Sequence, residues 1–224
     1  KTKTIPAPTK GWVTLNNVAL GVPGTALILD NFFPKADTVE LRSGFQEHSD
    51  TGEGVPVKSL MAYHGTTQNT LFACASDTIY DVTGSSASAS TITSLQTDEL
   101  QHVNFSTSGG HYLFCVNGVD QAFHYNGSAW ATPAITGVTS DTFSHVNVYK
   151  SRLYFVVKNS LKFAYLPVGV VAGAADTFEL GDIFTKGGNL VAMGTYTNDG
   201  GVGPDDYAVF VTSQGQVAMF QGSD

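Results

Sequence analysis

The chain has 224 residues and a mass of 23.7 kDa, with 42% hydrophobic and only 13% charged residues. It is long enough to bury a substantial core as one large domain or two small ones. The shortage of charged residues disfavours a disordered or mainly helical protein. The formal net charge of −8 disfavours tight, sequence-independent binding to nucleic acid, which needs clustered lysine and arginine.

Two cysteines, Cys74 and Cys115, are too few for a disulfide scaffold. No run of about 18 apolar residues occurs, so no membrane-spanning helix is predicted. The first residues contain no apolar signal region and do not begin with methionine.

Residues 1–57 are predicted to form an N-terminal arm with short β-strands. Apolar or alternating segments at 12–15, 26–29 and 38–42 are typical of strands. The segment at 30–34 is interpreted as a turn with buried aromatic side chains.

An internal repeat with an offset of 43 residues follows the arm. Six residues of the first copy recur as identical residues in the second. They are Ile92, Thr93, Asp98, His102, Val103 and Asn104, which return as Ile135, Thr136, Asp141, His145, Val146 and Asn147.

Residues 58–224 are predicted to contain four copies of this unit, at about 58–90, 91–134, 135–185 and 186–224. The first strands begin at Leu60, His102, His145 and Leu190. The second strands are predicted at 71–75, 112–116, 153–157 and 207–211, and turn residues follow them at Asp77, Gly118, Asn159 and Ser213. The third strands carry Tyr80, Tyr125, Tyr165 and Phe220, and weaker fourth strands are predicted at 91–95 and 135–138.

This periodicity predicts an all-β fold, a β-propeller-like array of four blades with three or four strands each, preceded by the β arm. Stacking lets small twisted sheets bury their faces against one another. A β-sandwich is the main alternative. In the fourth unit the turn at 197–206 is long and an outer strand is missing. Either residues 38–42 complete that blade, or the array is incomplete and the chain continues beyond Asp224, which we favour.

The repeat itself argues against chemical roles for its reactive residues. The positions of Cys74 and Cys115 correspond to Val156 and Phe210 in other units, which indicates core positions. His102 and His145 correspond to Leu60 and Leu190. We therefore expect both histidines, together with Asn104 and Asn147, to form structural hydrogen bonds to neighbouring blades.

The other histidines and the aspartates fit ordinary structural roles. His48, His64, His111 and His124 lack the spacing of metal ligands. Asp199, Asp205 and Asp206 could bind Ca²⁺, but an acidic turn is usually only solvated. Asp98 and Asp141 are expected to form local hydrogen bonds in turns. The sequence therefore predicts no catalytic, cofactor-binding or metal-binding residues and no enzymatic activity.

Several segments resemble the tail-nozzle or packaged-DNA-stabilisation proteins of short-tailed phages and prophages. The similar segments are 29–34 and 39–45 in the arm, and 102–105, 115–118, 145–148, 159–161, 166–167, 191–194 and 211–213 in the repeats. The resemblance implies a structural virion protein with a β-propeller.

According to this resemblance, the protein forms a homo-oligomeric ring, expected to be hexameric, below the portal and adaptor proteins. The ring would retain the packaged DNA and conduct it during ejection, without sequence-specific binding. Its location would be the virion tail, after synthesis in the bacterial host cytoplasm.

The residues alone also leave two other functions open. A carbohydrate- or receptor-binding propeller could use aromatic side chains such as Trp12, Trp130 or Tyr196. A hydrolase would need carboxylates or metal ligands at the blade axis, where the inner strands instead carry Met61, Val103, Val146 and Val191.

Overall fold

The computed structural model describes residues 2, 4–14, 21–199 and 204–222. These residues form an almost purely β structure whose one helical segment is a short 3₁₀ turn, η2 (Ser140–Thr142). The chain divides into two compact units, Lys1–Glu47 and His48–Asp224. Within the described residues, no helix has the length and hydrophobicity needed to cross a bilayer.

The first unit contains a hairpin of β1 (Phe32–Pro34) and β2 (Val39–Leu41). The strand predicted at 38–42 is thus confirmed. The prediction of buried aromatic side chains at 30–34 is wrong. Phe32 and Phe33 lie in β1 and are 45% and 55% exposed. The strands predicted at 12–15 and 26–29 contribute only one parallel bridge, between Trp12 and Ala26.

The second unit contains four antiparallel sheets whose strands pair in chain order, with one intervening strand left out of the third sheet. The first sheet comprises β3 (Ser59–His64), β4 (Asn69–Ala75), β5 (Thr78–Asp81) and β6 (Ser88–Ala89). The second comprises β7 (Gln101–Thr107), β8 (Gly110–Val116), β9 (Phe123–Tyr125) and β10 (Trp130–Ala131). The third comprises β12 (Phe143–Tyr149), β13 (Arg152–Val157), β14 (Lys162–Tyr165) and β16 (Asp176–Glu179). The fourth comprises β17 (Leu190–Asp199), β18 (Pro204–Thr212) and β19 (Val217–Phe220).

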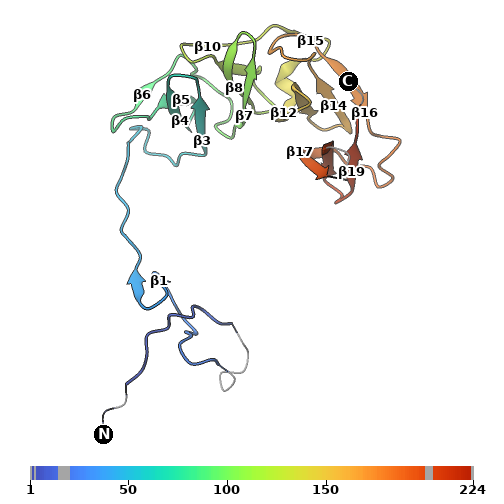
Figure 1. The fold of residues 1–224 in the computed structure, drawn as a ribbon. Coiled ribbons are helices and arrows are strands. Elements are labelled where there is room, and N and C mark those ends of the chain that lie inside the picture. The colour runs from blue at the N-terminus through green and yellow to red at the C-terminus, as the bar shows by residue number, and fades with distance from the viewer. Residues whose placement is uncertain (1, 3, 15–20, 200–203, 223–224) are drawn as a thin grey trace. The chain divides into compact units, whose positions relative to one another are not determined.

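Alternating apolar residues place a core between each pair of successive sheets. One core lies between the first and second sheets and contains Met61 and Cys115. The next contains Phe114 and Phe155 from the second and third sheets, and the last contains Phe163 and Phe210 from the third and fourth sheets. Figure 1 shows the four sheets following one another in chain order along an open arc.

The first three strands of each repeat were predicted correctly, but the fourth strands were not. β6 and β10 come earlier in the chain than the predicted segments at 91–95 and 135–138. Residues 91–95 instead pass beside β5, where the Ile79 N–H donates to the Ile92 carbonyl and the Leu95 N–H donates to the Asp77 carbonyl. β11 (Ile135–Thr136) pairs in parallel with β15 (Gly173–Ala174), outside the four sheets.

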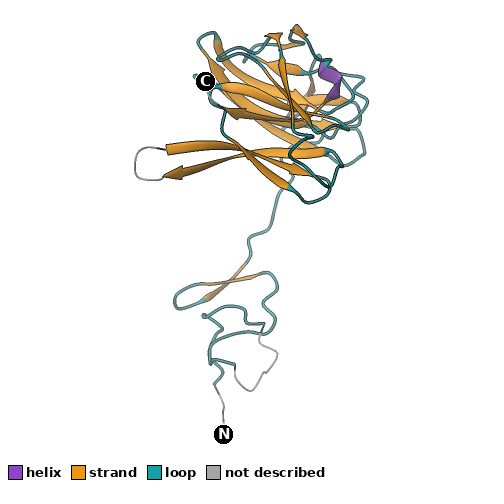
Figure 2. Ribbon diagram, turned by 90° about the vertical axis from the view of Figure 1, so that its right-hand side faces the viewer, coloured by secondary structure: helices purple, strands orange, loops and turns teal. Residues whose placement is uncertain are grey.

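The turn predicted at 197–206 is largely a continuation of the β17–β18 hairpin. The ladder runs through the pairs Thr197–Asp206 and Asp199–Pro204. In Figure 2 these two long strands lead to a grey tip, which is residues 200–203 and lies outside the described residues.

Candidate functional site

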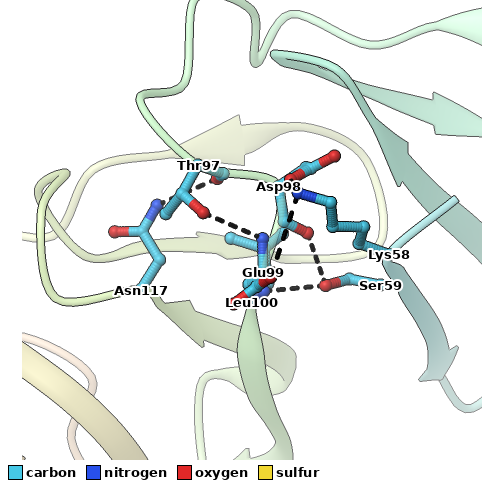
Figure 3. A network of polar contacts seen from close by, with 7 residues as sticks. All are labelled: Lys58, Ser59, Thr97, Asp98, Glu99, Leu100 and Asn117. Atoms are coloured by element: carbon cyan, nitrogen blue, oxygen red, sulfur yellow. Dashed lines mark hydrogen bonds and ion pairs between the residues drawn. The ribbon is translucent and has the colours of Figure 1, made fainter. Parts of the chain in front are cut away.

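A network of polar side chains lies where the second sheet's entry segment meets the start of the first sheet (Figure 3). Asp98 is only 6% exposed, and its Oδ1 lies 3.0 Å from Lys58 Nζ. The hydrogen bond with Asp98 and then its negative charge raise the pKa of Lys58. A buried carboxylate needs such a partner, so the ion pair fixes residue 98 against the first sheet.

Ser59 completes this connection through its hydroxyl group. Its Oγ donates to the Asp98 carbonyl at 2.6 Å and accepts the Leu100 N–H at 2.7 Å. Asn117 Nδ2 donates to the Thr97 carbonyl at 3.3 Å on the other side of the segment (Figure 3). Each of these groups is engaged within the fold, so the network joins two sheets.

Asp98 therefore differs from the prediction of a purely local turn residue, because its carboxylate pairs with Lys58, which directly precedes the first sheet. Asp141, its counterpart in the repeat, is exposed in the first turn of η2. The sequence did not predict Lys58 and Ser59 as partners of the segment that contains Asp98. Their only sequence signal is a cation and a hydroxyl next to a predicted strand, which is common in sheet proteins.

The two repeated asparagines bond to neighbouring sheets, as predicted. Asn104 Nδ2 donates to the Ala62 carbonyl at 2.8 Å, and its Oδ1 accepts the His64 N–H at 3.0 Å. Asn147 Nδ2 donates to the Met193 carbonyl at 3.3 Å.

The predicted bonds of the repeated histidines are not found. His145 Nδ1 is buried without a hydrogen-bond partner. Desolvation lowers the pKa of both His102 and His145 below the usual 6.5. His124 is also buried, with an unpaired Nδ1 and a pKa lowered by desolvation. His124 is buried, whereas His145 is half-buried and His102 is exposed, so desolvation favours the neutral ring most securely at His124.

Both cysteines occupy core positions, as predicted, and neither is in a disulfide. Cys115 Sγ contacts Met61 Sδ at 3.6 Å. Desolvation, followed by the charges of Asp98 and Asp77, raises the pKa of Cys74 to about 12. Desolvation also raises the pKa of Cys115 well above its usual value. Because the thiolate is the reactive form, these thiols are inert in the folded protein.

The aromatic candidates lie in different surroundings. Trp130 packs edge-on against Phe72 and Phe123 and helps line a cavity of about 270 Å³ with Asp81 and Tyr125. Its Nε1 is buried without a partner. Tyr196, in the fourth sheet, is 53% exposed. In the first unit, Trp12 is 66% exposed and donates from Nε1 to the Leu27 carbonyl at 2.9 Å.

The aspartates considered for Ca²⁺ binding and the inner-strand residues predicted to line a blade axis do not form one site. Asp206 Oδ1 accepts the Thr197 hydroxyl at 2.7 Å, whereas the side chains of Asp199 and Asp205 lie outside the described residues. Among the described residues, no three His, Cys, Asp or Glu side chains are grouped to hold a metal ion. Met61 and Val146 belong to different inter-sheet cores, so the inner-strand residues do not share one lining.

Comparison with known proteins assigns no family to this chain. No family model matches it, and no curated protein matches it. Among solved structures, the crystal structure of the computationally designed Ika4 protein is similar over 80% of this chain and 100% of that chain. The sequence identity is 12% and the TM-score is 0.49, so no inference is drawn from this similarity.

Proposed function

We propose that this chain is a structural virion protein of a phage tail channel, a component of the nozzle or DNA-stabilisation ring below the portal. The observation that carries the proposal is the resemblance of the arm and repeats to such proteins, at segments that include 29–34, 102–105 and 145–148. The stacked antiparallel sheets support it, because scaffold proteins are commonly built from repeated sheets that bury one another.

The finer architecture belongs to the same proposal. The four sheets are interpreted as four blades of a β-propeller-like array, with the N-terminal β arm outside it. Three features favour this reading: consecutive strands within each sheet, a core between successive sheets and the arc in Figure 1. A structure of assembled particles that showed these sheets in a two-layer sandwich would overturn it.

The proposed partners are other copies of the chain in a hexameric ring, the portal and adaptor proteins, and the packaged DNA. A net charge of −8 suits a channel through which DNA passes without binding, since like charges repel. The protein would be made in the host cytoplasm and end in the virion tail. No residue is assigned a catalytic role.

The proposal is tested on particles. We expect mass spectrometry of purified virions to detect the chain, and electron microscopy with a specific antibody to place it at the tail. Deletion of its gene should yield particles that lose their packaged DNA. A chain absent from virions, or a deletion that leaves DNA retention and ejection unchanged, would contradict the proposal.

A carbohydrate- or receptor-binding module is the second candidate, favoured by the cavity beside Trp130. Aromatic faces next to a carboxylate are a common way to bind sugars, and Phe72, Asp81 and Tyr125 line this cavity too. Binding on a glycan array that is lost in Asp81→Ala, while the variant keeps its melting temperature, would favour this function. No binding across a broad panel would exclude it.

A further inference from the structure

Among the residues that the structure describes, the two end sheets of the second unit each keep one apolar face without a partner sheet. In the second and third sheets, alternate residues point to opposite sides, and both sides are buried. Cys115 contributes to the core with the first sheet, whereas its neighbour Phe114 contributes to the core with the third. The end sheets have a neighbouring sheet on one side only.

The free side of the fourth sheet, here called the rear face, is apolar across all three strands. Cross-strand neighbours share a face of a sheet, and the register places six residues on this side. They are Ala192, Val211 and Val217 in one row and Gly194, Val209 and Met219 in the next. Val211, Val217 and Met219 are 37%, 61% and 55% exposed. A solvated sheet face normally carries polar side chains, so this one is typical of a contact surface.

The free side of the first sheet, here called the front face, is likewise apolar. It carries Leu60, Ala62, Leu71 and Ala73, which face one another across β3 and β4. Leu60 is 60% exposed. Leu60, Leu71 and Ala73 help form an apolar groove of about 480 Å³.

The front face is only partly open, since Ala73 and Val82 are 3% and 5% exposed, and the segment 48–57 contacts the face without filling the groove. His48 Nε2 donates to the Val82 carbonyl at 2.9 Å, and the Tyr80 hydroxyl donates to Glu53. Val57 lines the groove and is 46% exposed.

The front and rear faces correspond to the two surfaces that meet in each of the three inter-sheet cores of the chain. In each inter-sheet core, the side of one sheet that points toward the next sheet in the chain packs on the side of that next sheet that points back toward it. The front face is the side of the first sheet on which a preceding sheet would pack. The rear face is the side of the fourth sheet on which a following sheet would pack. The side chains named on the two faces are uncharged, and the Glu53 carboxylate beside the front face is hydrogen-bonded to the Tyr80 hydroxyl, so bringing the faces together leaves no charge without a partner.

We propose that a second copy of this chain covers these faces, with the rear face of one copy packed on the front face of the other. One copy cannot satisfy both faces by itself in this structure, because the first and fourth sheets lie at the two ends of the arc (Figure 1). Two copies joined in this way make two equivalent contacts and close a ring of eight sheets. Rings of stacked sheets commonly contain about four to eight.

Each contact joins two different faces, and two copies related by a twofold axis make this contact twice, which leaves neither face free. The argument uses only the side chains on the sheet faces and not the resemblance to virion proteins. A hexameric ring of the kind proposed above would therefore need contacts outside these two faces. The virion test reads the presence of the chain in particles, so either proposal can fail alone.

The test is the mass of the full chain by sedimentation equilibrium over a range of concentrations. We expect a species of twice 23.7 kDa. Val217→Lys on the rear face and Leu60→Glu on the front face should each raise the dissociation constant by about a hundredfold or more, because each disturbs both contacts. Both side chains are exposed, so each variant should keep its fold, which circular dichroism and the melting temperature check.

Mixing the two variants distinguishes this contact from its alternatives. In a mixed pair, one contact joins two unaltered faces and the other joins the two substituted faces, whose introduced charges are opposite, so the dimer should return. Val168→Lys is the matched control, since Val168 is 56% exposed but belongs to neither face. It should leave the dimer intact.

Three results would overturn the proposal. One is a wild-type chain that stays monomeric at every concentration, which would leave another protein as the occupant. Another is a mixture that fails to recover, as expected if like faces pair with like. The third is a control variant that dissociates the dimer as strongly as Val217→Lys.

Discussion

Asn104 and Asn147 occupy matching positions in the sequence repeat, yet their side chains bond in opposite directions along the chain. Asn104 bonds to Ala62 of the preceding sheet, whereas Asn147 bonds to Met193 of the following sheet. The reversal coincides with a β-bulge between Phe143 and His145 in β12. One extra residue in a strand moves the following side chains to the other face.

We predict that the two asparagines stabilise separate interfaces. Asn147→Ala should lower the free energy of unfolding by about 1 kcal/mol, since it leaves the Met193 carbonyl without its donor. Asn104 is exposed, so water replaces part of its bonding, and Asn104→Ala should cost about 0.5 kcal/mol. Urea denaturation of both variants and of the double variant measures these changes.

The double variant provides the internal check. Because the two side chains act between different pairs of sheets, their effects should add to within about 0.5 kcal/mol. A larger coupling energy would show that the two interfaces respond to each other. Equal, negligible losses would mean that neither side-chain bond contributes.

The strand positions were predictable because alternation and turn residues are local properties. Gly118 and Asn159, predicted as turn residues, both have positive φ, at 76° and 56°. The neighbouring sheet toward which a given side chain points was not predictable, because a β-bulge reverses this direction without changing the residues that recur in the repeat. The outer strands β6 and β10 were also missed, because two-residue strands carry no alternating pattern.

Among the candidate residues, the core role of the cysteines followed from comparing repeats, but the partner of Asp98 did not. Lys58 lies far earlier in the chain, and only the packing of two sheets brings it to Asp98. The apolar rear face does have a signal in the sequence. Val209, Val211, Val217 and Met219 alternate with the core residues Ala208, Phe210 and Ala218, so both sides of the fourth sheet are apolar.

The ion pair of Lys58 and Asp98 should matter more than an ion pair on the surface. We expect Lys58→Met to lower the melting temperature clearly, since it leaves the buried Asp98 carboxylate without its counter-charge. Lys162→Met is the control, because Lys162 and Glu179 are 3.7 Å apart with both side chains largely exposed. Surface pairs of that kind contribute about 0–1 kcal/mol. Equal effects of the two substitutions in thermal denaturation would contradict the structural role of Asp98.

The cysteines should be unreactive until the protein unfolds. With the pKa of Cys74 at about 12, almost none of its thiol is ionised near pH 7. We expect no reaction with Ellman's reagent in the native protein and reaction of both thiols in denaturant. A cysteine introduced at exposed position 108 by Ser108→Cys should react at once in the native state. Rapid labelling of the wild-type native protein would show that the core between the first two sheets opens readily.

Buried His124 should make the protein less stable in acid. Its folded-state pKa is lowered below 6.5 by desolvation, so the unfolded chain binds the proton more readily. Stability therefore is fully present above about pH 6.5 and falls as the pH decreases toward the folded-state pKa. His102 and His145 act in the same direction.

We predict that His124→Phe is more stable than the wild type and loses less stability between pH 7.5 and 5.5. The ring lies between Tyr112 and Phe114, so phenylalanine keeps the aromatic contacts and removes the unpaired Nδ1, for a gain of about 1 kcal/mol. The control is His64→Phe at an exposed position. Denaturant unfolding at several pH values measures both. An unchanged pH dependence in His124→Phe would assign the acid effect to the other two histidines.

The β12–β13 hairpin is strained at its turn. Lys150 and Ser151 have positive φ, at 46° and 56°, a conformation that costs a residue with a Cβ about 1 kcal/mol. Ser151→Gly relieves this cost but increases the entropy of the unfolded chain. We therefore expect a net gain of about 0.5 kcal/mol in the free energy of unfolding, measured with urea. Ser88→Gly is the control, since Ser88 lies in the extended strand β6 and should lose about 0.5–1 kcal/mol. A loss of stability in Ser151→Gly as large as that in Ser88→Gly would show that the turn is not strained at this residue.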